Sequence, residues 1–254
     1  MKYTLSSVVV AALALSISPS AAAQSEITLL SPDPIKATLE KLVEGFEAKT
    51  GTRVKVTYGT GVSTRKTVAS GQALDVSLLF APFPEALKTG NIVPGSATVI
   101  ARLRLALAVQ KGASKPDIST AEAAKRTLLN AKSIISVDPT QGSVGGIALA
   151  ALDKLGITDQ VKPKIKWVQT GGIVQDSVAK GETEIALGPY LSDMRNPGLD
   201  VVGALPPEAS TPVDITGFLS TSVKDPKAAK ALLDYLSSHE VASFYEAAKI
   251  FPAH

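Results

Sequence analysis

Apolar runs alternate with helical patterns along most of the chain. A short apolar run at residues 27–30 precedes a stretch from Ile35 to Phe46 whose apolar positions recur at the spacing of one helix face. Further apolar runs follow at residues 54–58 and 76–80, with a short helical pattern between them. Because strands and helices that alternate in this way build mostly parallel sheets with helices on both faces, the pattern predicts an α/β fold.

The same alternation restarts after Ile100 and continues to the end of the chain. Pro226 opens the first of two closing amphipathic helices, and Glu240 opens the second. The predicted strands of this part are residues 103–109, 133–137, 164–168, 185–187 and 213–219. We therefore expect two α/β lobes.

The order of these strands suggests how the chain divides. Strand-forming residues return after Val201, which suggests that the C-terminal segment rejoins the first lobe. The division is then a signal peptide at 1–23, a first lobe of 24–103 plus 202–254, and a second lobe of 104–201. It needs two hinge crossings, near 101–105 and 196–202. A linear pair of domains stays open as the alternative, since no Pro-rich linker marks a boundary.

The first residues resemble an export signal. Lys2 precedes the apolar run Val8–Ile17, Pro19 breaks the run, and three alanines end at Ala23. The run falls short of the ~18–20 apolar residues that span a bilayer. We expect cleavage near Ala23 and release into the periplasm, without lipid attachment because no Cys lies at that site.

Composition narrows the chemistry. The chain has no Cys, and its histidines are His239 and His254, both in the C-terminal part. Thiolate catalysis and thiolate metal sites are therefore excluded. Two histidines near the C-terminus are too few for a histidine metal cluster and poorly placed for a Ser-His triad. The net charge of +3 is spread along the sequence and aromatics are 5% of residues, which does not favour nucleic-acid binding. We expect a monomer with no metal, no cofactor and no nucleic-acid partner.

Loops that join a predicted strand to a predicted helix share one design. They are rich in Gly, Ser, Thr and Pro and lie at 31–34, 59–63, 141–146 and 170–172. In an open α/β sheet such loops gather beyond the carboxyl ends of the strands, where ligands bind. Helix N-termini there offer backbone N–H groups and partial positive charge to an anion. Ordinary helix capping also favours these residues, so one such loop alone decides little.

Several stretches together resemble periplasmic molybdate-binding proteins, which are type II solute-binding proteins. The stretches are 26–46, Gly59-Thr60-Gly61-Val62-Ser63, 71–76, and Asp138-Pro139 followed by Gly145-Gly146. The resemblance covers essentially the whole chain after the signal. It implies two α/β lobes joined by two crossings, with a small anion held between them and delivered to a membrane ABC transporter permease. By position, with neighbouring charged residues added, the expected ligand-binding residues are Ser31, Asp33, Lys36, Thr60, Gly61, Ser63, Arg65, Ser143, Gly145, Gly172 and Tyr190.

Departures from the family pattern bear on the ligand. Pro34 and Gly61 stand where the resemblance implies serine ligands, while Lys36, Arg65 and Lys66 cluster at the helix starts of the first lobe. Because arginine presents a planar fork suited to carboxylates, an organic polycarboxylate is favoured over molybdate.

The leading hypothesis is a receptor without catalytic activity. The alternative is an enzyme on the same scaffold, because some relatives of the molybdate-binding proteins resemble periplasmic aconitate isomerases, which move a proton and a double bond within a tricarboxylate. Its acid–base group would come from Asp33, Ser143 or Tyr190, since no histidine falls in the expected cleft.

Overall fold

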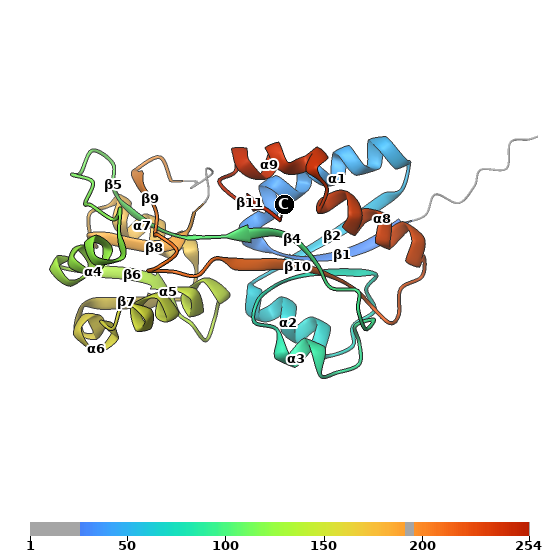
Figure 1. Cartoon of the computed structure of the whole chain (residues 1–254), viewed down its shortest axis with the longest axis horizontal. Coiled ribbons are helices and arrows are strands. Elements are labelled where there is room, and N and C mark those ends of the chain that lie inside the picture. The colour runs from blue at the N-terminus through green and yellow to red at the C-terminus, as the bar shows by residue number, and fades with distance from the viewer. Residues whose placement is uncertain (1–25, 191–195, 254) are drawn as a thin grey trace, which may run out of the picture.

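The computed structural model describes residues 26–190 and 196–253 and shows two lobes, each built on one β-sheet (Figure 1). The expected signal peptide lies outside the described residues. Within them, no helix is both long enough and apolar enough to cross a membrane.

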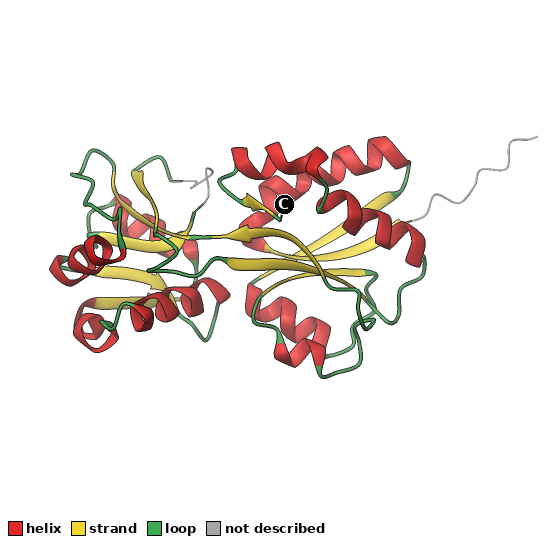
Figure 2. Cartoon of the chain, in the orientation of Figure 1, coloured by secondary structure: helices red, strands yellow, loops and turns green. Residues whose placement is uncertain are grey.

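The first lobe is a six-stranded sheet in the order β11-β4-β10-β3-β1-β2. Helices cover both faces of it, as Figure 2 shows. Its strands are β1 (Glu26–Pro32), β2 (Arg53–Gly59), β3 (Val76–Phe80), β4 (Thr98–Leu103), β10 (Val213–Leu219) and β11 (Phe251–Pro252). Its helices are η1 (Asp33–Ile35), α1 (Lys36–Thr50), α2 (Gly61–Ala69), α3 (Pro84–Leu87), α8 (Pro226–Leu236), η3 (His239–Val241) and α9 (Ala242–Ala247).

The second lobe is a five-stranded sheet in the order β7-β6-β8-β5-β9. Its strands are β5 (Leu105–Gln110), β6 (Ile134–Val137), β7 (Ile165–Val168), β8 (Ile185–Pro189) and β9 (Leu199–Ala204). Its helices are α4 (Ala121–Asn130), α5 (Ser143–Lys154), α6 (Thr158–Val161), η2 (Lys162–Lys164) and α7 (Gly171–Ala179).

Both sheets are mixed, which refines the expectation of mostly parallel sheets. Strands β1, β2 and β3 pair in parallel, as do β6, β7 and β8. The antiparallel pairs involve β4, β10 and β11 in one lobe and β5 and β9 in the other. Most of these strands lead into or out of the crossings between lobes, so their direction is set by the passage of the chain rather than by a strand-helix-strand unit.

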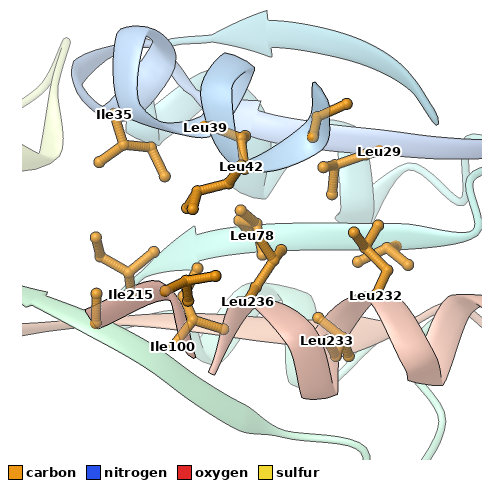
Figure 3. Close-up of a cluster of buried hydrophobic side chains, with 14 of the residues drawn as sticks. Leu29, Ile35, Leu39, Leu42, Leu78, Ile100, Ile215, Leu232, Leu233 and Leu236 are labelled. Carbon is orange, nitrogen blue, oxygen red and sulfur yellow. The ribbon is translucent and has the colours of Figure 1, made fainter. Parts of the chain in front are cut away.

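The core of the first lobe explains why a continuous apolar run became its central strand. Leu78 of β3 faces α1 and α8, whereas the neighbouring Leu79 packs with Phe218 on the other face of the sheet. A strand that is covered on both faces loses the alternation of apolar and polar positions. Figure 3 shows the α1/α8 side, where Leu42 and Leu236 approach the sheet from the two helices.

The first crossing divides a run that the apolar pattern predicts as one strand. Residues 103–109 belong partly to β4 of the first sheet and partly to β5 of the second, with Arg104 between them. The prediction of a single strand there is wrong because an unbroken apolar run carries no mark of where one sheet ends and the next begins. The crossing itself lies within the expected range 101–105.

The second crossing lies later than the expected 196–202. Strand β9 pairs with β5, and Leu205 and Ala209 are buried in the core of the second lobe. The Leu205 N–H donates to the Leu105 carbonyl at 2.8 Å, which extends the ladder past β9. The boundary at 201/202 therefore falls inside β9, and the chain reaches the first sheet only at Val213.

Arg104 ties the two crossings together. Its Nη2 donates to the Leu205 carbonyl at 2.9 Å, and its guanidinium carbon lies 5.0 Å from the centre of the Phe251 ring. Phe251 belongs to β11, which adds to the edge of β4. The C-terminal strand of the first lobe is thus packed against the hinge.

Candidate functional site

A cleft of about 730 Å³ lies between the lobes and is lined by residues of both. The first lobe contributes the segment from Asp33 to Ala37 and the start of α2. The second lobe contributes the starts of α5 and α7 and the end of β8. The helix starts predicted from the small-residue loops therefore meet at one cavity.

The starts of α2 and α7 are built in the same way. Thr60 precedes α2 and its hydroxyl accepts from the Ser63 N–H at 3.0 Å. Thr170 precedes α7 and its hydroxyl accepts from the Ile173 N–H at 3.4 Å. Each cap satisfies an N–H of the first turn but leaves the amides before it without an acceptor inside the helix. Both helix starts line the cleft, so their unpaired amides are available there to bind an anion.

The start of α5 differs because glycine precedes it and no side chain caps it. Its loop is held from outside the helix: Asp138 accepts from the Thr140 hydroxyl at 2.6 Å and from the Thr140 N–H at 2.7 Å. These two bonds hold the pKa of Asp138 below its usual value. Gly145 packs so closely on the β6–α5 loop that a Cβ there would clash with the Val137 carbonyl oxygen.

Among the described residues that line the cleft, Lys36 is the only one with a positively charged side chain. Its Nζ lies 5.1 Å from the centre of the Tyr58 ring and 3.8 Å from a Glu40 carboxylate oxygen, and its side chain is 44% exposed. Burial of the Tyr58 hydroxyl, with a smaller contribution from Glu40, raises the pKa of Tyr58 to about 12. Tyr58 is therefore a neutral platform beneath Lys36 at physiological pH.

The structure brings part of the expected ligand-binding set together. Asp33, Lys36, Thr60, Gly61, Ser143 and Gly172 line the cleft. Their roles in binding stay predictions.

Other members of the set lie elsewhere, each for a structural reason. Ser31 is fully buried because β1 continues through it, and its hydroxyl donates to the Pro32 carbonyl at 3.3 Å. The Ser63 hydroxyl donates to the Thr60 carbonyl at 3.0 Å, within the cap of α2. Gly145 packs closely against the backbone of the β6–α5 loop and does not line the cleft.

Arg65 and Tyr190 also do not line the cleft. The Arg65 guanidinium donates to Ser143 across the lobes, with Nη1 2.7 Å from Oγ. The Tyr190 N–H donates to the Arg104 carbonyl at 2.8 Å, at the hinge. Lys66 is exposed on α2 and is likewise absent from the cleft lining.

Sequence reasoning missed a set of polar residues in the second lobe. The cleft is also lined by Gln141, Gln169, Thr170, Gln175, Asp176 and Asn196. Thr170 had a signal, because it opens the predicted loop at 170–172. Gln141 had the same signal, because it opens the predicted loop at 141–146. The other amide side chains had none, since glutamine or asparagine at a loop or helix position is ordinary until the fold shows which way it faces.

In the described part of the chain, no group of three His, Asp or Glu side chains gathers closely enough to hold an ion.

Comparison with known proteins now identifies the family. Residues 27–248 match the bacterial extracellular solute-binding protein family. The chain belongs to this family. Its members include the solute receptors of ABC transporters, and the chain resembles the molybdate-binding type in sequence and in fold.

Individual relatives cover nearly the whole chain. Aconitate isomerase from a Pseudomonas species is 28% identical over 250 residues, which span 95% of this chain and 94% of the relative. Molybdate-binding protein ModA from Azotobacter vinelandii is 28% identical over 243 residues, or 93% of each chain. The substrate-binding domain of a putative molybdenum ABC transporter from Clostridium difficile superposes with a TM-score of 0.76 at 16% identity, covering 91% of this chain and 100% of that one.

Proposed function

We propose that this protein is a periplasmic receptor that captures a small organic polycarboxylate between its lobes and presents it to an ABC transporter. The observation that carries the proposal is the convergence of helix starts from both lobes on one cleft that also holds Lys36. The N-terminal signal peptide would direct export and be removed near Ala23.

The lining favours an anion without demanding a tetrahedral one. Backbone amides at the starts of α2, α5 and α7 supply neutral donors, and Lys36 supplies one full positive charge. Pro34 and Gly61 line the cleft where the molybdate-type pattern implies serine donors, so the dense hydroxyl cage of an oxyanion site is incomplete. The cleft is also far larger than one tetrahedral oxyanion fills, which supports an extended organic ligand.

The number of carboxylates is limited by the charges present. Arg65 and Lys66, which the sequence offered as carboxylate partners, are not in the lining, and the carboxylates of Asp33 and Asp176 are. One carboxylate would pair with Lys36 and a second would rest on helix amides. Any further acidic group of the ligand would need a neutral donor such as Gln169.

Capture would be a hinge motion about the two crossings. Ligand contacts made to both lobes would stabilise the closed form. The ratio of closed to open molecules would change only by the factor by which the ligand binds the closed form more tightly.

A thermal-shift and calorimetric titration tests the proposal. Citrate, trans-aconitate, succinate, molybdate and sulfate would each be added to the purified mature protein, with a concentration-dependent rise in Tm expected for a polycarboxylate. Lys36→Met should weaken binding about tenfold, whereas Lys41→Met, an exposed position on the same helix, should not. Binding of molybdate alone would reject the polycarboxylate, and no binding by any of the five would reject the receptor.

The second candidate is an isomerase, favoured by the near full-length match to aconitate isomerase. In this reaction one carbon of the substrate loses a proton and the double bond shifts by one position. A proton then adds at the other end of the allylic system, so the substrate gains and loses no proton overall. Asp33 and Ser143, two of the expected acid–base groups, line the cleft from opposite lobes, which supports this candidate. Incubation with trans-aconitate followed by NMR would show the cis isomer. Its absence, with tight binding, would leave only the receptor.

A further inference from the structure

We infer that Arg65 is a positioning residue that reaches across the lobes and turns the Ser143 hydroxyl into a hydrogen-bond donor for the ligand. This inference rests on the proposed function, because it concerns how the same cleft binds its anion. It replaces the expectation that Arg65 contacts the ligand itself.

The geometry of the contact is well defined. Arg65 lies on α2 of the first lobe and Ser143 begins α5 of the second, and Nη1 of Arg65 is 2.7 Å from Oγ of Ser143. The Arg65 side chain is only 16% exposed, and its Nε lies 3.7 Å from a Glu85 carboxylate oxygen. The Nε edge of the guanidinium therefore lies near a carboxylate of its own lobe, while Nη1 donates to the opposite lobe.

Ser143 stands between two cavities. It lines the main cleft and also a smaller cavity of about 480 Å³, and Arg65 lines only the smaller one. The cation thus reaches the serine from the side away from the ligand. This arrangement suits a group that acts through Ser143 rather than on the anion.

The chemistry follows from what a guanidinium can do. It carries only donors, so Ser143 Oγ must be the acceptor in this bond and its own hydrogen is left for another partner. An anion in the cleft accepts hydrogen bonds, so it can take that hydrogen. The charge of Arg65 also makes the hydroxyl a stronger donor, as in other chains of polarised hydrogen bonds.

Gly61 makes room for this arrangement. A Cβ on Gly61 would clash with Oγ and Cβ of Ser143 and would lie 3.1 Å from Cδ2 of Phe80, in the first lobe. The second lobe's hydroxyl therefore occupies the space that a side chain at position 61 would take. The serine that the family pattern implies at 61 is replaced here by one supplied from the opposite lobe.

A double-mutant cycle tests the inference. With citrate and trans-aconitate as probes, Arg65→Met and Ser143→Ala should each weaken binding about tenfold, and Arg65→Met made in the Ser143→Ala protein should change it less than twofold. Arg65→Lys should recover part of the loss, since lysine also only donates. Lys66→Met, exposed on the same helix, is the matched control. Equal losses from Arg65→Met with and without Ser143 would mean direct ligand contact and would overturn the proposal.

A ligand-free measurement separates this inference from the proposed function. The chain has no Cys, so spin labels at Lys88→Cys and Lys162→Cys would be unique, and both positions are exposed, next to α3 and α6 on the side where α2 meets α5. Without ligand, Arg65→Met should shift the label distances to longer values. If the wild type binds none of the probes, the proposed function fails, but the label distances still show whether Arg65 holds Ser143 across the lobes. Label distances that do not change in Arg65→Met would overturn the inference.

Discussion

The starts of α2 and α5 face the same cleft from opposite lobes, yet they use their side chains differently. In the first lobe the hydroxyls of Thr60 and Ser63 are engaged in capping their own helix. In the second lobe α5 has no side-chain cap, and the Ser143 hydroxyl is engaged by the other lobe. The Thr60 hydroxyl accepts from its own helix and the Ser143 hydroxyl accepts from the opposite lobe, so each keeps its own hydrogen for a ligand. The two starts therefore differ in what holds the hydroxyl in place: its own helix in one lobe, the other lobe in the second.

Gly145 provides the strongest test of how α5 is fixed without a cap. Because a Cβ there would meet the Val137 carbonyl and the backbone of the following loop, Gly145→Ala should lower the free energy of unfolding by about 2–4 kcal/mol and abolish binding. Gly146→Ala is the matched control, since nothing lies within 4 Å of its Cβ, and it should be neutral or stabilising by up to about 1 kcal/mol. Chemical denaturation measures both. Equal stabilities for the two variants would contradict close packing at position 145.

Asp75 extends the comparison to a polar group used entirely inside the first lobe. It is buried and accepts from the Thr28 N–H at 2.8 Å, the Thr28 hydroxyl at 2.7 Å and the Lys224 N–H at 2.9 Å. Burial alone would raise the pKa of Asp75, but the bonds from Lys224 and Thr28 outweigh it and hold the pKa below its usual value. Its contribution is therefore present above the unfolded pKa and is lost as pH falls through the folded one.

Asp75→Asn should thus cost about 2 kcal/mol near neutral pH and less in acid, with ligand affinity unchanged. Denaturation at a series of pH values below 5 measures it. A cost that grows toward low pH would contradict a folded-state pKa of Asp75 below its unfolded value.

Gly61 sharpens the contrast at the point where the lobes meet. Gly61→Ala should push against Ser143 and weaken binding of the proposed polycarboxylate about tenfold while leaving Tm nearly unchanged, because the severe clash is with Ser143 of the other lobe. Titration calorimetry and thermal unfolding together check this. A large loss of Tm with normal affinity would place the strain inside the first lobe instead.

The smallest loss of stability is expected from removing a single helix-capping side chain, either near the cleft or far from it. Thr120 caps α4 by accepting from the Ala123 N–H at 3.1 Å, away from the cleft, so Thr120→Ala should cost about 1 kcal/mol without changing affinity. Thr60→Ala should cost a similar amount and also weaken binding, since Thr60 lines the cleft. If both variants bind like the wild type, Thr60 acts only as a cap.

Much of the fold could be predicted from the apolar pattern, since runs such as 76–80 became strands with the same bounds. The break at Arg104 and the late return after Ala209 could not, because both depend on which sheet a strand joins. In the site, the small-residue loops located the cleft. The sequence does not show where the side chains of Ser31 and Arg65 point. Ser31 is buried because β1 continues through it, and Arg65 lies on α2 beyond the loop and reaches the other lobe.

The path of the chain through the two cores has a consequence for biosynthesis. The core of the second lobe is drawn from one continuous stretch between Leu105 and Ala209, whereas the core of the first needs Leu232, Leu236 and Ile250 as well as the early strands. A polypeptide that emerges with its N-terminus first can therefore complete its middle before its beginning. The opening strands must wait for the last helices to arrive, so the first lobe remains vulnerable to aggregation or proteolysis until synthesis and translocation are nearly finished.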